Sequence, residues 1–115
     1  MAGGRAGVSG YLVEHDSFRL LIDPGYAIVP RLLERIDATE VDAVLVSHSH
    51  PDHCADLHPL LRARVRREEP APALPVHTLP GAVDRVLDLD GAGTLQDAFT
   101  LVEFVAGDQF EVGPF

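Results

Sequence analysis

The segment 48–53, with the sequence His-Ser-His-Pro-Asp-His, constrains this chain most, because it places three imidazoles and a carboxylate within six residues. It directly follows the apolar run 44–46 and precedes a helical pattern, so a buried strand ends where these polar side chains begin. Histidines scattered singly are usually packed or solvated, whereas three at one strand end are hard to explain by packing. Imidazole and carboxylate suit zinc first, with manganese or iron as alternatives. The segment therefore predicts a metal site.

The spacing within this segment divides its metal-binding side chains into two pairs. If residues 41–47 form a strand, His48 and His50 leave its end toward the same side and can share one ion. Asp52 and His53 come where the chain enters a helix, so they turn away from the first pair and can hold a second ion. Two-metal hydrolases hold their ions roughly 3.5–4 Å apart. We therefore predict a two-zinc site whose ligands are His48, His50, Asp52 and His53.

The segment 48–53 also matches the HxHxDH signature of the metallo-β-lactamase fold hydrolases. Within that family, the stretches 9–14, 18–25 and 56–57 resemble the ribonuclease Z-like and phosphodiesterase-like branch. The resemblance implies the same division of the four ligands between two ions. It also implies an α/β fold, the N-terminal half of an αββα sandwich with a mixed sheet flanked by helices, as one partial domain over residues 1–115.

Two aspartates receive further roles from the resemblance. Asp23, which follows the expected strand 18–22, would orient a ligand histidine through a hydrogen bond, as metal-bound imidazoles generally require. Its alternative is a turn-forming residue in the Asp-Pro-Gly sequence 23–25, and the sequence favours neither. Asp52 would take part in proton transfer as well as bind metal, so it is the predicted catalytic residue.

The resemblance implies a metal-dependent hydrolase in which a hydroxide shared by two zinc ions attacks phosphorus, because zinc lowers the pKa of bound water to about 7. The Ser-Gly-Tyr-Leu-Val and Ile-Asp-Pro-Gly contexts favour a phosphodiesterase of the cyclic-nucleotide or RNA 3′-processing type. Hydrolysis of a lactone, thioester or β-lactam on the same fold is one alternative. A catalytically incomplete metal-binding fragment is another.

The length of the chain separates it from complete members of the family, whose sandwich uses many more than 115 residues. We expect the family's first strand and its remaining metal ligands, which include a third histidine and a bridging aspartate, to be absent from these residues. The chain would then be a fragment with one apolar sheet face exposed. Such a face drives association, either as a homodimer or with another chain.

The composition of the chain indicates the cellular compartment in which we expect the protein. No apolar run approaches the roughly 20 residues that cross a bilayer, and the N-terminus lacks the basic start and long apolar core of a signal peptide. We therefore expect a cytoplasmic protein with no membrane partner. Cys54 is the only cysteine, which excludes an intrachain disulfide, and we expect it to be a small packed residue.

The net charge of −9 argues against a long nucleic acid as the main partner, because such proteins neutralise phosphates with basic patches. The only basic cluster, four arginines within 62–67, lies at the end of an expected helix, where cations complement the helix dipole. A small phosphodiester needs less basic surface, since the metal ions themselves bind the phosphate. We therefore favour a small phosphodiester substrate and keep RNA as the alternative.

The apolar periodicity predicts one α/β domain. The expected strands are 10–14, 18–22, 41–46, 75–78, 99–105 and 109–112, and the expected helices are 30–35, 54–67 and 82–89. The first two strands should form a hairpin across 15–17, and the last two a hairpin across 106–108.

The remaining polar candidates receive structural interpretations. We interpret His15 as a turn residue, His58 as an exposed helix residue and His77 as a structural residue at a strand end. Ser47 and Ser49 flank His48 without a base beyond the predicted ligands, so we interpret both as hydrogen-bonding loop residues and not as nucleophiles.

The assignment of the segment predicts that His48→Ala and Asp52→Ala each lower the metal content, because each removes one of few ligands. Elemental analysis of the purified protein after exhaustive dialysis measures this. A double variant that kept the wild-type zinc stoichiometry would show that the metal site lies elsewhere.

Overall fold

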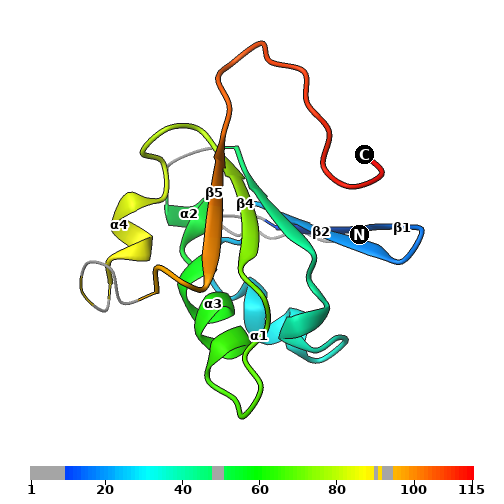
Figure 1. The fold of residues 1–115 in the computed structure, drawn as a ribbon, viewed down its shortest axis with the longest axis vertical. Coiled ribbons are helices and arrows are strands. Elements are labelled where there is room, and N and C mark those ends of the chain that lie inside the picture. Colours follow the sequence, from blue (N-terminus) through cyan, green and yellow to red (C-terminus); the bar gives the residue numbers. More distant parts are fainter. Residues whose placement is uncertain (1–9, 48–50, 90, 92–94) are drawn as a thin grey trace.

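The computed structural model describes residues 10–47, 51–89, 91 and 95–115, without the side chains of Pro51 and Asp52. At its centre is a five-stranded sheet with the strand order β1-β2-β3-β4-β5 (Figure 1). The strands are β1 (Tyr11–His15), β2 (Phe18–Ile22), β3 (Ala43–Val46), β4 (Leu74–Thr78) and β5 (Phe99–Glu103). The helices are α1 (Ile28–Leu33), the 3-10 helix η1 (Ala38–Glu40), α2 (Pro51–Cys54), α3 (Leu57–Val65) and α4 (Asp84–Leu87).

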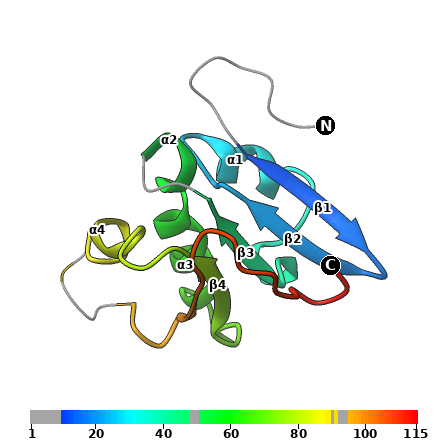
Figure 2. The same cartoon turned by 90° about the horizontal axis from the view of Figure 1, so that it is seen from above.

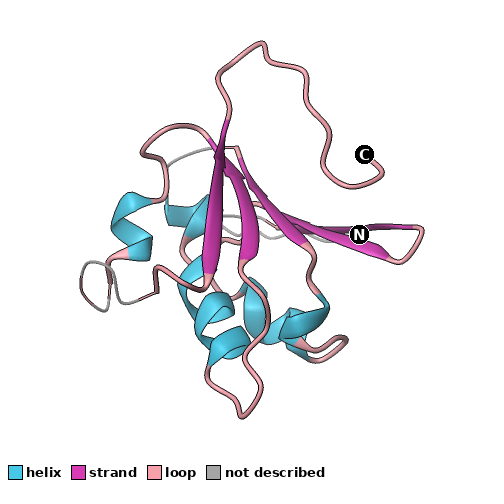
Figure 3. Cartoon of the chain, viewed as in Figure 1, coloured by secondary structure: helices cyan, strands magenta, loops and turns pink. Residues whose placement is uncertain are grey.

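The sheet is mixed. β1 pairs with β2 in the antiparallel direction, whereas β2, β3, β4 and β5 are parallel neighbours. The described helices gather on one face of the sheet (Figure 3). The main core lies between this face and the helices, and its least exposed members are Leu21, Val44, Val46, Leu57, Leu60, Leu61, Leu74 and Val76. The predicted α/β class, with a mixed sheet and helices, is confirmed.

The position of the central strand β3 explains why its sequence is apolar without interruption. Val44 and Val46 face the main core, while Ala43 and Leu45 belong to a second, smaller cluster on the opposite face. A parallel strand that is covered on both faces has no solvent-facing side, so its residues do not alternate between apolar and polar. The segment 48–53 therefore follows a strand in the most buried part of the sheet.

The hairpin predicted at the start of the chain is confirmed. β1 and β2 are joined by Asp16 and Ser17, which both have positive φ (51° and 67°), as a type I′ turn requires. The interpretation of His15 as a turn residue is wrong, because it is the last residue of β1 and lies opposite Phe18.

The single helix predicted over 54–67 is wrong, because α2 and α3 are separated by a turn at residues 55–56. Asp56 causes the break. Its backbone N–H donates to the carbonyl of Pro24 (2.8 Å) and not to a carbonyl of α2. Its carboxylate accepts from the N–H of Val29 (2.9 Å), which holds the turn against the start of α1.

Three further elements differ from the prediction. α1 begins two residues before the predicted helix 30–35, and α4 is shorter than the predicted helix 82–89. The 3-10 helix η1 was not predicted. It is fixed by a capping box, in which the Asp37 side chain accepts from the backbone and the Glu40 side chain accepts from the N–H of Asp37.

The hairpin predicted at the end of the chain is also wrong. β5 pairs in parallel with β4, and residues 104–115 contain no strand. This C-terminal segment crosses the sheet on the face opposite the helices, as the red part of the ribbon shows (Figure 2). Val112 is buried there with Leu20 and Ala43, and the ring of Phe115 lies 6.3 Å from that of Phe18. These contacts remove apolar surface from water, which stabilises the position of the segment on this face.

The C-terminal segment covers this second face only in part. Four large apolar side chains on this face or on the segment are 40–48% exposed, namely Tyr11 (48%), Val102 (40%), Phe110 (43%) and Phe115 (40%). Association of the chain through this face therefore stays a prediction. Among the described helices, none has the length and apolar character needed to cross a membrane.

Arg64, one of the four arginines within 62–67, is a buried charge. It is 4% exposed, and its guanidinium donates to the carbonyls of Ala38 (3.1 Å), Val41 (2.7 Å) and Pro72 (2.9 Å). Burial lowers the pKa of this guanidinium, and the Asp42 carboxylate opposes the shift. The side chain thus ties α3 to the start of β3 and to the loop before β4.

We expect Arg64→Ala to lower the free energy of unfolding by about 3 kcal/mol, because it leaves buried carbonyls without a donor. Urea unfolding followed by circular dichroism measures this. Arg66→Ala, at the exposed end of α3, serves as the control and should change stability by less than about 0.5 kcal/mol. Equal effects of the two substitutions would contradict the role assigned to Arg64.

Candidate metal centre

The carboxyl ends of β2 and β3 meet at one edge of the sheet, because the two strands are parallel neighbours with Ile22 opposite Leu45. Asp23 follows the first strand and Ser47 the second. Ligand sites of open parallel sheets commonly lie at this edge, where loops leave the strands (Figure 1). The chain enters the segment 48–53 from here.

Asp23 joins the two strand ends. It is 7% exposed, and its backbone N–H donates to the carbonyl of Leu45 (2.8 Å). One carboxylate oxygen accepts from the backbone N–H of Ser47 (2.7 Å) and the other from the Ser47 hydroxyl (2.6 Å). The prediction that Ser47 is a hydrogen-bonding loop residue is confirmed.

Asp23 also forms the turn that was its alternative interpretation. Its carbonyl accepts from the N–H of Gly25 (2.8 Å), and its φ of 52° lies in the left-handed region. Aspartate and asparagine adopt this region more readily than other residues with a side chain. The turn aims the buried carboxylate at the end of β3, which confirms the turn-forming interpretation. The role of Asp23 in orienting a ligand histidine stays a prediction.

His53 lies beside this carboxylate. Its Nδ1 is 3.4 Å from Oδ2 of Asp23, and its side chain is 23% exposed. This separation is longer than the roughly 2.7–2.9 Å of a tight charge-assisted hydrogen bond. Hydrogen bonds between active-site side chains are often this long when no ligand is bound. The structure therefore pairs the predicted ligand His53 with the aspartate that was expected to orient a ligand histidine.

The other predicted ligands are only partly placed. His48 and His50 lie outside the described residues, and so does Ser49. Asp52 lies in α2 directly before His53, but its side chain is outside the described part. Within the residues that the structure describes, no group of three or more side chains could hold a metal ion. Metal binding by His48, His50, Asp52 and His53, and the catalytic role of Asp52, stay predictions.

The chemistry at His53 fits zinc. A neutral imidazole that donates its Nδ1–H to a carboxylate carries its lone pair on Nε2, which is the form in which histidine binds metal. Asp23 would fix the orientation of the ring and leave Nε2 for the ion. The same contact would suit manganese or iron, since it selects a histidine nitrogen and not a particular metal.

Cys54 and His77, which were both expected to be structural, lie in the core and on the second face of the sheet. Cys54 is 1% exposed within the main core, which confirms that it is packed. His77 is 8% exposed on the second face of the sheet and stacks on Phe110 at 5.9 Å. Burial lowers its pKa, which favours the neutral ring. His58, expected to be exposed, is half-buried on α3.

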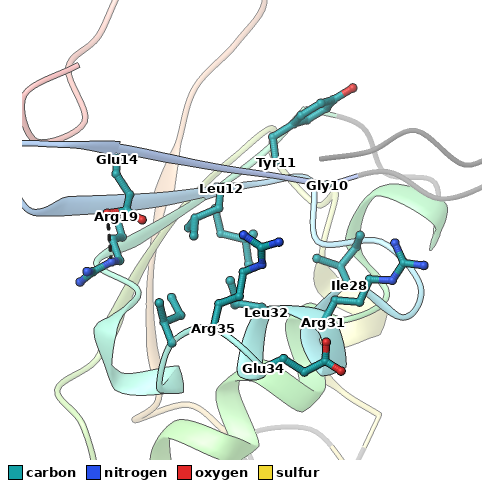
Figure 4. A pocket seen from close by; sticks show the side chains of 12 residues that line it. Gly10, Tyr11, Leu12, Glu14, Arg19, Ile28, Arg31, Leu32, Glu34 and Arg35 are labelled. Atoms are coloured by element: carbon teal, nitrogen blue, oxygen red, sulfur yellow. Dashed lines mark ion pairs between the residues drawn. The ribbon is translucent and has the colours of Figure 1, made fainter. Parts of the chain in front are cut away.

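A groove of about 890 Å³ lies between the β1–β2 hairpin and α1 (Figure 4). Its lining mixes apolar and charged side chains, among them Leu12, Arg19, Ile28, Arg31, Leu32 and Arg35. Neither Asp23 nor His53 lines it. The described members of the candidate metal centre therefore lie outside this groove.

Comparison with known proteins gives a family match over nearly the whole chain. A model described as the metallo-beta-lactamase superfamily matches residues 3–114. A crystal structure of the metallo-beta-lactamase fold protein YhfI from Bacillus subtilis superposes with a TM-score of 0.75 at 29% identity. The superposition covers 93% of this chain and 42% of that one.

Two curated proteins are similar in sequence. The anti-Pycsar protein Apyc1 of Saccharibacillus brassicae is 33% identical over 114 residues, which is 90% of this chain and 46% of that protein. The ribonuclease Z of Methanopyrus kandleri is 46% identical over 52 residues, which is 44% of this chain and 19% of that protein. The chain thus spans less than half the length of these relatives.

The geometry predicts that Asp23→Asn weakens zinc binding about 10- to 100-fold, because the amide no longer presents a charged acceptor to the His53 ring. Asparagine keeps the left-handed backbone, so the effect does not come from a strained turn. Competition with a chromophoric chelator measures the zinc dissociation constant. Asp97→Asn, in an exposed turn, is the control, and a dissociation constant within twofold of wild type for Asp23→Asn would contradict the role of Asp23.

Proposed function

Because the chain belongs to the metallo-β-lactamase superfamily, we propose that the protein is a metal-dependent phosphodiesterase whose two zinc ions are held by His48, His50, Asp52 and His53. The contact between Asp23 and His53 is the observation that carries this proposal. It places a carboxylate beside Nδ1 of a histidine of the HxHxDH signature, as metal-bound imidazoles generally require, and leaves Nε2 for the ion.

The phosphodiester class is supported by the resemblance of segments 9–14 and 18–25 to one branch of the superfamily. A ribonuclease is among the relatives, and its name describes hydrolysis of a phosphodiester backbone. We therefore prefer phosphodiesters to lactones, thioesters and β-lactams, which other enzymes of the same fold hydrolyse.

A small phosphodiester is preferred to a long RNA because arginines in 62–67 serve the fold. Arg64 is buried against backbone carbonyls. Arg67 forms two hydrogen bonds with the Asp37 carboxylate (2.8 and 3.2 Å), and this contact holds the pKa of Asp37 below its usual value. At least two of the four guanidinium groups are thus engaged within the chain, which reduces the basic surface that a phosphate backbone could use.

In the proposed reaction the residues of this chain orient the metal ligands and accept a proton. When bound, zinc lowers the pKa of a coordinated water to about 7 and offsets negative charge on the phosphoryl oxygens. Asp23 fixes the His53 ring and, through Ser47, the start of the segment 48–53. Asp52 would accept a proton on its carboxylate as the attacking water is deprotonated.

The segment supplies two side chains for each ion, whereas catalytic zinc is usually held by three protein ligands. We propose that other residues of the protein complete each set. If they do not, the chain binds metal without turnover, which is the alternative of a catalytically incomplete fragment.

We expect the zinc-loaded protein to hydrolyse bis-p-nitrophenyl phosphate and to leave nitrocefin and simple lactones intact. Asp52→Ala should lower the turnover at least about 100-fold, because it removes both a ligand and a proton acceptor. Release of p-nitrophenolate, followed by absorbance, measures this.

The exposed-site variant Asp97→Ala is the control and should retain full turnover. Hydrolysis of nitrocefin or of a lactone, without hydrolysis of the phosphodiester, would replace the proposal by its alternative on the same fold.

A further inference from the structure

Asp56 stands at the break between α2 and α3 and is buried, with 9% exposure. Its carboxylate Oδ2 accepts from the backbone N–H of Val29 at 2.9 Å, across 27 residues of sequence. Its backbone N–H donates to the carbonyl of Pro24 at 2.8 Å, and its carbonyl accepts from the N–H of Leu60 at 3.1 Å. One residue thus binds the loop after β2, the start of α1 and the first turn of α3.

The bond to Val29 serves as a cap for α1. The residue that precedes this helix is Ala27, which has a φ of 64° and makes no side-chain cap hydrogen bond. The first turn of α1 also contains no acidic residue. The Asp56 carboxylate, from a distant part of the chain, therefore satisfies one of the N–H groups that every helix leaves unpaired at its start.

The residues that Asp56 binds lie close in sequence to Asp23 and His53, the two members of the candidate orienting pair. Pro24 directly follows Asp23, and Asp56 comes three residues after His53. The Asp56–Pro24 bond joins the backbone next to Asp23 to the backbone that follows α2, the helix that contains His53. The Asp56–Val29 bond holds the other end of the loop between β2 and α1. A movement of α2 relative to the loop would change the distance of 3.4 Å between His53 Nδ1 and Asp23 Oδ2.

We infer that Asp56 is a positioning residue for the candidate metal centre, which holds the Asp23 turn and α2 in the register that keeps His53 against the Asp23 carboxylate. The inference rests on the proposed function where it concerns metal binding. The effect on the His53 ring does not depend on metal and can be measured without it.

The required feature of Asp56 is an acceptor at the position of Oδ2, not its charge. A buried carboxylate that accepts a backbone N–H can be replaced by an isosteric amide with the acceptor oxygen kept. Asp56→Asn should therefore behave like wild type, whereas Asp56→Ala removes the acceptor and releases the loop. This contrast separates the hydrogen bond from the charge.

The test uses the metal-free chain with 15N-labelled histidine and records the tautomer of His53 by long-range 1H–15N correlation. In wild type we expect the tautomer with the proton on Nδ1, facing Asp23. Asp56→Ala should shift His53 toward a mixture of the two tautomers, and Asp56→Asn should restore the wild-type spectrum. In the zinc-binding assay, Asp56→Ala should raise the dissociation constant about 10-fold, and Asp56→Asn should keep it within twofold of wild type.

Asp37→Ala is the matched control, because Asp37 also caps a helix, η1, but touches neither member of the pair. It should lower stability without a change in the His53 tautomer or in zinc affinity. The double variant Asp23→Asn with Asp56→Ala should bind zinc no more weakly than Asp23→Asn alone, since Asp56 acts through Asp23. If Asp56→Ala does not fold, Asp56→Ser, which keeps a shorter polar side chain, takes its place.

A wild-type tautomer and a zinc affinity within twofold of wild type in Asp56→Ala would overturn the inference, as would additive losses in the double variant. A wild-type chain that binds no zinc would refute the proposed function instead. In that case the tautomer of His53 in the same variants still decides whether Asp56 positions the pair.

Discussion

The buried carboxylate of Asp23 is the interaction on which the arrangement at the carboxyl edge of the sheet depends. It accepts two hydrogen bonds from Ser47 and lies 3.4 Å from the ring nitrogen of His53. Burial of a carboxylate costs on the order of several kcal/mol unless hydrogen-bond donors replace the water that it loses. The end of β2, the end of β3 and helix α2 are therefore held together by one group, which also faces the candidate ligand.

A second buried charge holds the opposite end of the central strand. Arg64 donates to the carbonyl of Val41, which precedes β3, and Asp23 binds Ser47, which follows it. The strand between these residues contributes Val44 and Val46 to the main core with 0% exposure. Apolar packing thus places β3 in the middle of the sheet, and the two charged side chains set where its ends lie.

Local patterns in the sequence predicted the parts of the fold that depend on neighbouring residues. The apolar sequence of β3 and the short polar connection between β1 and β2 were enough to place both. The break before α3 and the path of the C-terminal segment were missed, because they follow from distant contacts. Asp56 bonds to Val29 across 27 residues, and Val112 packs on Leu20 from the other end of the chain. The residue types in 48–53 indicated metal chemistry, and the family resemblance named Asp23 as the partner of a ligand histidine. The geometry adds that the histidine beside Asp23 is His53. No periodicity signals the buried roles of Asp56 and Arg64.

A crystal structure of the zinc-loaded protein, with anomalous differences recorded at the zinc edge, tests the central claim most directly. The account predicts anomalous peaks at the carboxyl edge of β3, one of them bonded to Nε2 of His53 at about 2.0–2.1 Å, while Nδ1 of the same ring faces Asp23. Zinc bound away from this edge, or a His53 ring turned from Asp23 in the loaded protein, would contradict it.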